Sequence, residues 1–261
     1  MSAFTEDGMS NVLNIIKNIE INSLPIHENY GSVKDGLKAY ERGKGVPAQP
    51  LEKEQFEIFK NSRTYFSNKR EDEKYRKFLE GTNIQRYKIN WGDTFLKYGK
   101  NLAAKRDSKI FEGDRILIRR IPKKSTYALM AVLTDDEYVH EQSIETIGNL
   151  KVSSAFLLGV LNSKVESYFA LHKYEFLQRK TFPQMRLYQI KQFPVPNATL
   201  KEQNQISDLV NKQLELYALS DPTKEDEEKM NLLNLEIDEQ VLHLYKLSES
   251  EKEIIRNFTI N

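Results

Sequence analysis

The chain has 261 residues, of which 39% are hydrophobic and 30% charged, and its formal net charge at pH 7 is +1. This balance is typical of a folded globular protein and excludes a disordered chain. The length suffices for one large domain or two small ones. Cysteine is absent, which excludes a disulfide framework and a thiolate metal site.

The histidines and the apolar residues argue against a metal site and against a membrane-spanning protein. The four histidines (His27, His140, His172 and His243) are far apart in the sequence and form no ligand pattern, so no metal site is predicted. No apolar run approaches the roughly 18 residues of a membrane span. The N-terminus lacks the basic and apolar regions of a signal peptide. We therefore expect a cytoplasmic protein with no membrane partner.

The small net charge hides an uneven distribution. Residues 60–126 contain 19 Lys or Arg and 8 Asp or Glu, whereas residues 201–261 contain 7 and 14. A basic middle and an acidic tail are expected when one face of a protein meets a polyanion and another does not. A lysine-rich solvated surface is the alternative interpretation, and charge alone does not choose between them.

In chain order, the first predicted helix covers residues 11–19, where apolar residues recur at helical spacing. Glycine and proline break the following segment, 23–50, into strand and loop. Residues 114–122 and 127–136 predict two strands joined by a turn that displays Lys123 and Lys124. Residues 153–174 predict one buried helix, because their apolar residues are spaced by three and four.

The stretch after this helix contains Pro194 and Pro196, which impose extended backbone. Thr199 and Glu202 then form a capping box that begins a helix. Pro222 is predicted to lie in the first turn of a second helix. Two apolar stripes joined by a short polar link predict an antiparallel hairpin, and a second capping box, residues 248–251, begins a short final helix.

This order of elements predicts an α+β fold. We expect a mixed α/β body with a twisted sheet over residues 1–196. A C-terminal antiparallel α-helical hairpin should follow over residues 197–261 and form an arm. The proline pair would then be a stiff joint between the two.

No catalytic motif is found in the sequence: Gly-x-Ser-x-Gly, His-Glu-x-x-His and a dinucleotide fingerprint are all missing. Asp221 with Glu227, Glu228 and Lys229 superficially resembles a nuclease carboxylate–lysine set. This set lies in the acidic tail and is more simply explained as a solvated helix face. We therefore predict no catalytic residue in this chain, and the question of whether it is an enzyme stays open.

Basic residues alternate with aromatic ones in residues 86–106. Lys and Arg neutralise phosphates, and Arg can also present a bidentate fork to guanine. Trp91, Phe95 and Tyr98 are better explained as core aromatics. The candidate DNA-binding residues are Arg86, Lys88, Lys100, Lys105, Arg106, Arg119, Arg120, Lys123 and Lys124.

Five segments, in this order, resemble one family: residues 36–50, 77–121, 157–169, 189–196 and 236–255, which include KFLEGTNIQRYKINW, LLGVLNSKVESYF and QIKQFPVP. The family is that of the TaqI-like C-terminal specificity domains of adenine-specific DNA methyltransferases and type IIG restriction-modification enzymes. The resemblance implies that the body, residues 1–196, is a DNA target-recognition unit that recognises a specific sequence in double-stranded DNA. It also implies a separate methyltransferase domain or subunit as partner.

The methyltransferase half of such enzymes binds S-adenosylmethionine through a Gly-rich motif and holds the target base with an Asn-Pro-Pro-Tyr-like motif. Neither motif occurs here. The resemblance therefore implies a recognition portion without its catalytic half and without a cofactor of its own. Two alternatives stay open: a nuclease fragment that cleaves DNA itself, and a structural protein-interaction module that uses the helical arm.

Overall fold

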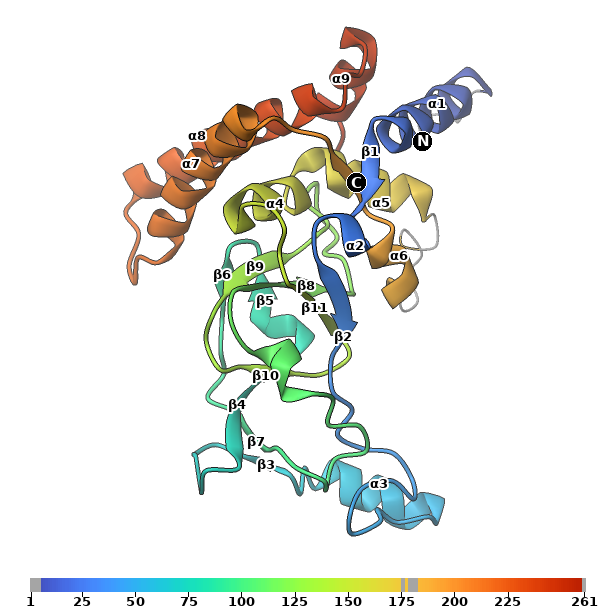
Figure 1. Ribbon diagram of the computed structural model, residues 1–261, viewed down its shortest axis with the longest axis vertical. Helices are drawn as coiled ribbons and strands as arrows, with labels where there is room; N and C mark the ends of the chain where they lie inside the picture. Colours follow the sequence, from blue (N-terminus) through green and yellow to red (C-terminus); the bar gives the residue numbers. More distant parts are fainter. Residues whose placement is uncertain (1–5, 175–176, 178–182, 260–261) are drawn as a thin grey trace.

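The computed structural model describes residues 6–174, 177 and 183–259. It has three tiers along its long axis (Figure 1): helices at one end, a four-stranded sheet in the middle, and at the other end helix α3 with a second four-stranded sheet, which is smaller because most of its strands are shorter. The helices are α1 (Glu6–Ile21), α2 (Ile26–Asn29), α3 (Lys53–Asn61), α4 (Ser154–Leu161), α5 (Lys164–Lys173), α6 (Leu187–Lys191), α7 (Leu200–Tyr217), α8 (Lys224–Leu244) and α9 (Glu249–Arg256). The structure thus combines helices with several sheets and ends in a run of helices, which confirms the α+β prediction.

The middle sheet is antiparallel throughout, in the order β2-β11-β8-β9. Its strands are β2 (Ser32–Asp35), β11 (Ile144–Gly148), β8 (Arg115–Arg119) and β9 (Ala131–Thr134). The β8–β9 hairpin confirms the two strands predicted at 114–122 and 127–136, although both are shorter. Ile116 and Ile118 face the core shared with the helices, while Leu117 faces a separate apolar cluster. Alternate residues on β8 therefore serve opposite faces of the sheet.

The smaller sheet has the order β10-β4-β7-β3 and its own core. Its strands are β10 (Val139–His140), β4 (Tyr75–Leu79), β7 (Phe95–Lys97) and β3 (Phe66–Ser67). A two-stranded pair, β5 (Ile84–Gln85) and β6 (Lys88–Ile89), connects this region to the middle sheet. The core of this tier consists of Leu37, Tyr65, Phe78, Leu96, Leu102, Phe111 and Val139. Each tier with a sheet thus has an apolar interior.

The single helix predicted at 153–174 is wrong: the structure has two helices, α4 and α5, with a break at Asn162 and Ser163. Ser163 is the N-cap of α5, and its hydroxyl accepts from the backbone N–H of Glu166. The Asn162 side chain bonds both the N–H and the carbonyl of Ala131 at 3.0 Å. The break therefore fixes this turn to strand β9.

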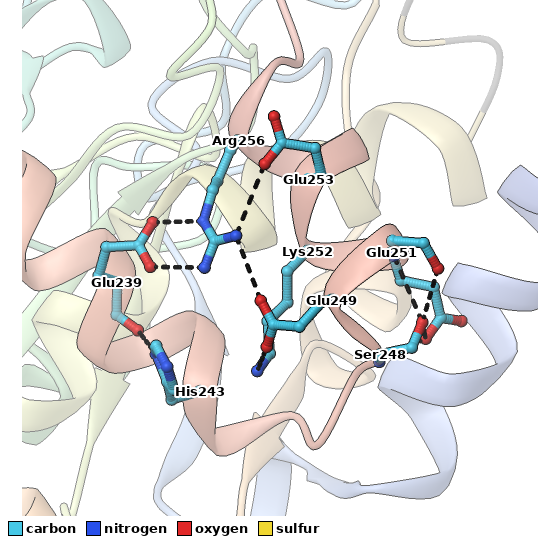
Figure 2. Close-up of polar contacts among 9 residues, drawn as sticks. Glu239, His243, Ser248, Glu249, Glu251, Lys252, Glu253 and Arg256 are labelled. Atoms are coloured by element: carbon cyan, nitrogen blue, oxygen red, sulfur yellow. Dashed lines mark hydrogen bonds and ion pairs between the residues drawn. The ribbon is translucent and has the colours of Figure 1, made fainter.

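The C-terminal tier confirms the predicted pair of helices α7 and α8 and the short final helix α9. Thr199 and Ser248 form the two predicted capping boxes, and Thr223 forms a third with Asp226. Because Thr223 is the N-cap of α8, Pro222 lies outside the helix, not in its first turn as predicted. Arg256 of α9 donates to both carboxylate oxygens of Glu239 of α8 at 2.8 and 2.9 Å (Figure 2), which ties the two helices together.

Helix α7 packs closely against α4. A Cβ atom at Gly159 would lie 2.8 Å from Cγ2 of Val210, so only glycine permits this approach. The largest core cluster includes residues of the body and of the tail alike. The division at residue 196 into two domains thus stays a prediction.

The segment with the proline pair forms β12 (Pro194–Pro196), an extended strand that pairs with β1 (Ser23–Pro25). Tyr245, the C-cap of α8, places its hydroxyl 2.8 Å from the carbonyl of Pro194 and also in contact with Glu166 of α5. All three groups are buried. The joint between body and tail is therefore held by a polar contact inside the core. None of the helices in the described ranges is long and apolar enough to cross a membrane.

Candidate nucleic-acid interface

Arg86, a predicted DNA ligand, is held inside the protein. Its guanidinium Cζ lies 3.7 Å from the centroid of the Tyr127 ring. Its Nη2 donates to the carbonyl of Asn162 and to Oδ1 of Asn234, both at 3.0 Å. The hydroxyl of Tyr127 in turn donates to Asp238 of α8 at 2.6 Å. This arrangement fixes Arg86 as a link between the β5–β6 hairpin and the helical tier.

Arg106 and Arg120 share one carboxylate, that of Asp35 at the end of β2. Arg106 Nη2 donates to Oδ2 at 2.7 Å, and Arg120 Nη2 donates to Oδ1 at 3.0 Å. Arg120 also pairs with Glu145, whose side chain is 0% exposed. Burial raises the pKa of Glu145 to about 8, and the nearby Arg120 opposes this rise. The two arginines therefore balance the negative charge of the half-buried Asp35 and of the buried Glu145.

The other six candidates differ in exposure. Lys100, Lys105, Lys123 and Lys124 are exposed, while Lys88 and Arg119 are half-buried. Burial lowers the pKa of the Arg119 guanidinium, and its Nε has no hydrogen-bond partner in the described part of the chain. Lys105 lies next to Ala104, which pairs with Lys38. The DNA role of all nine residues stays a prediction.

Two adjoining hollows of about 690 and 620 Å³ together form a groove. They share Arg120 and Gln184. We call this surface the recognition groove. Its lining residues are Leu37, Lys38, Ala39, Tyr40, Lys60, Asn61, Arg63, Phe66, Phe78, Glu80, Arg120, Glu141, Gln142, Ser143, Gln184, Met185, Arg186, Leu187, Tyr188 and Gln189. They come from α3, α6, the turn between β10 and β11, and the segment after β2.

The recognition groove carries more basic than acidic side chains, five against two. Lys38 pairs with Glu41, and Arg63 pairs with Glu80 while its guanidinium lies over the Phe66 ring. Lys60 and Arg186 are exposed and make no ion pair with any described residue. These two side chains are therefore available to an anion.

The polar floor of the groove is built on the turn between β10 and β11. Gln142 Nε2 donates to Oδ2 of Asp35 at 2.8 Å. The hydroxyl of Ser143 accepts from the N–H of Gly81 at 2.9 Å and donates to Glu141. Tyr188 adds an aromatic ring that is 61% exposed. The groove thus combines cations, amides and an exposed ring, a mixture that suits a polyanion with polar base edges.

Of the nine predicted residues, only Arg120 lines the recognition groove. Arg106 is linked to Arg120 because both bind Asp35. Lys105 follows Ala104, whose backbone pairs with the groove residue Lys38. The prediction missed Lys60, Gln142, Gln184, Arg186 and Tyr188. These residues are spread over more than 120 positions of the sequence, so no local pattern unites them. The alternation of Gln184, Arg186 and Tyr188 near the QIKQFPVP segment was the one available signal.

Trp91, Phe95 and Tyr98 each pack against another aromatic ring. Trp91 packs edge-on against Phe95 and Tyr138, with ring centroids 5.2 and 6.2 Å apart, and Tyr98 packs edge-on against Phe111. The carboxylate–lysine set lies at the exposed start of α8, where Lys229 pairs with Glu225. No group of three or more acidic or histidine side chains in the described ranges is placed to hold a metal ion.

Residues 76–195, a little under half of the chain, match the family of TaqI-like C-terminal specificity domains, which confirms the resemblance over this part of the chain. This part of the chain contains nearly all of β4 to β12, and therefore most of the middle sheet and 12 of the 20 residues that line the groove.

Two particular proteins are similar over longer stretches. The Methanocaldococcus jannaschii protein named "Putative type II restriction enzyme and methyltransferase RM.MjaORFECS2P" is 28% identical over 192 residues, which is 70% of this chain and 16% of that protein. The structure of the Type IIL restriction-modification enzyme MmeI in complex with DNA aligns with 89% of this chain and 35% of its own, with 10% identity and a TM-score of 0.49. This chain thus spans a small part of the length of the relative it matches.

Proposed function

We propose that this chain recognises a specific sequence in double-stranded DNA on behalf of a restriction-modification enzyme. The observation that carries the proposal is the recognition groove. It brings to one surface two cations without an ion-pair partner among the described residues, several amides and an exposed tyrosine. Cations fix a protein on the phosphate backbone, whereas amides can read base edges. The family match over residues 76–195 supports the same function.

We further propose that methyl transfer belongs to a separate domain or subunit that binds S-adenosylmethionine. The sequence contains neither of the motifs that such a domain requires. The name of the M. jannaschii relative joins a restriction enzyme and a methyltransferase in a much longer protein. In that arrangement the present chain would position the DNA, and the partner would carry out the chemistry.

Within the groove, we assign phosphate contacts to Lys60 and Arg186, because both are exposed and without an ion-pair partner among the described residues. Lys100, Lys105, Lys123 and Lys124 of the predicted set are also exposed, and we assign further phosphate contacts to them. Arg106 and Arg120 instead support the floor of the groove through Asp35.

The test is the salt dependence of duplex binding, measured by fluorescence anisotropy of the full chain with a random-sequence 30-base-pair DNA. Affinity should fall steeply between about 50 and 200 mM salt, because each neutralised phosphate releases counterions. Lys60→Ala and Arg186→Ala should each weaken binding and reduce the salt slope by about 1.

Lys212→Ala is the matched control, since Lys212 is an exposed lysine on α7, away from the groove. It should leave both affinity and slope unchanged. Binding that does not depend on salt, or an equal loss in the control, would contradict the proposed function.

A further inference from the structure

We propose that Gln142 reads the major-groove edge of an adenine in the recognised sequence, and that Asp35 makes this reading selective by fixing the orientation of the Gln142 amide. The inference rests on the proposed function and adds to it the residue and the base. It concerns one side chain in the floor of the recognition groove.

The backbone around Gln142 is held from both sides. The N–H of Arg120 donates to the carbonyl of Ser143 at 2.9 Å, and the N–H of Ile144 donates to the carbonyl of Glu141 at 3.1 Å. Leu37 also forms a bridge with Glu141. The turn that carries Gln142 is therefore fixed before any ligand binds.

The orientation of the side-chain amide follows from chemistry. The Gln142 amide contacts Oδ2 of Asp35 at 2.8 Å. An ionised carboxylate only accepts hydrogen bonds, so the amide must present its NH₂ group to Asp35, not its oxygen. Arg106 and Arg120 both donate to the same carboxylate, which holds it in place.

The atoms that remain free determine which base fits. Oε1 of Gln142 has no hydrogen-bond partner among the residues that the structure describes, and one N–H also remains. Adenine offers an N6 amino donor and an N7 acceptor at its major-groove edge, which match an amide oxygen and an N–H. Guanine offers two acceptors, O6 and N7, so a fixed amide oxygen would face O6 and repel it.

A freely rotating glutamine could turn over and donate to guanine. Here that rotation would place Oε1 against the Asp35 carboxylate, with two acceptors in contact. Selectivity therefore depends on Asp35 as a positioning residue and on Gln142 as the residue that touches the base. Arg106 and Arg120, predicted as DNA ligands, would act through this carboxylate.

The experiment selects duplexes with a randomised 10-base-pair centre on the full 261-residue chain and sequences the bound fraction. The wild-type protein should enrich a motif with adenine at one position. Gln142→Met, which keeps the length of the side chain, and Gln142→Ala should each lower the preference for adenine at that position by about tenfold or more, with the other positions unchanged.

Asp35→Asn should relax the same position toward guanine, because an asparagine can both donate and accept and no longer prevents rotation of Gln142. Gln240→Ala is the control, since Gln240 is exposed on α8; it should give the wild-type motif. Thermal melting of each variant verifies that it is folded. If Gln142→Ala or Asp35→Asn does not fold, the result for Gln142→Met decides whether Gln142 reads the adenine.

The two proposals fail differently in this experiment. If the wild-type chain enriches no motif at all, the proposed DNA function fails. If it enriches a motif that both Gln142 variants reproduce in full, or if the position they alter prefers a base other than adenine, the assignment of Gln142 is overturned while DNA recognition stands.

Discussion

At the scale of single residues, the sequence reveals charge but not the partner of each charge. Arg86 and Lys88 are neighbours in the same basic segment. The structure holds Arg86 against Tyr127, Asn162 and Asn234, whereas Lys88 is a half-buried side chain at the start of β6. The partners of Arg86 come from 40 to 150 positions further along the chain, which no local pattern could indicate.

We therefore expect Arg86 to stabilise the fold and not to bind DNA. Arg86→Ala should lower the free energy of unfolding by roughly 2 kcal/mol, because it removes hydrogen bonds from a charged donor and leaves their acceptors unpaired. Chemical denaturation measures this change, and Lys88→Ala should stay within about 0.5 kcal/mol of the wild type. A variant at Arg86 that keeps its stability and loses DNA affinity would contradict this assignment.

At the scale of elements, hydrophobic periodicity predicted the long amphipathic helices α7 and α8 because each has one apolar face. It could not find the break between α4 and α5, since these helices are buried on nearly all sides. The sequence did contain a signal, Ser163 followed by Glu166, which has the spacing of a capping box. In the structure Ser163 caps α5, but the carboxyl group of Glu166 instead contacts Tyr245.

This contact predicts a dependence of stability on pH. Burial raises the pKa of Glu166 to about 8, from an ordinary value of 4.5. A protonated Glu166 can donate to the Tyr245 hydroxyl, which then donates to the carbonyl of Pro194. Between pH 4.5 and 8 the folded protein holds a proton that the unfolded chain has lost, so stability decreases as pH rises through this window.

Glu166→Gln should remove this contribution, because the amide does not titrate. The decrease in urea midpoint between pH 5 and pH 8 should be smaller in the variant than in the wild type. It should not vanish, since burial raises the pKa of Glu145 to about 8 as well and acts in the same direction. An identical decrease in both proteins would show that Glu166 is ionised in the folded state.

At the scale of the whole molecule, the uneven charge seen in the sequence corresponds to separate regions of the fold. The acidic C-terminal segment forms α7 to α9 in the helical tier (Figure 1). The recognition groove is instead lined by residues of α3, α6, the smaller sheet and the turns beside the middle sheet. The sequence could predict this separation from composition. It could not predict the groove, because Lys60, Gln142 and Arg186 meet only through the non-local pairing of the strands.

The most direct test of DNA recognition at the groove is hydrogen exchange of the full chain with and without a saturating duplex, followed by mass spectrometry of its peptides. We predict slower exchange in the peptides that contain residues 60–63, 141–143 and 184–188, with exchange in α7 to α9 unchanged. Protection confined to α7 to α9, with exchange in the three groove segments unaltered, would contradict the account.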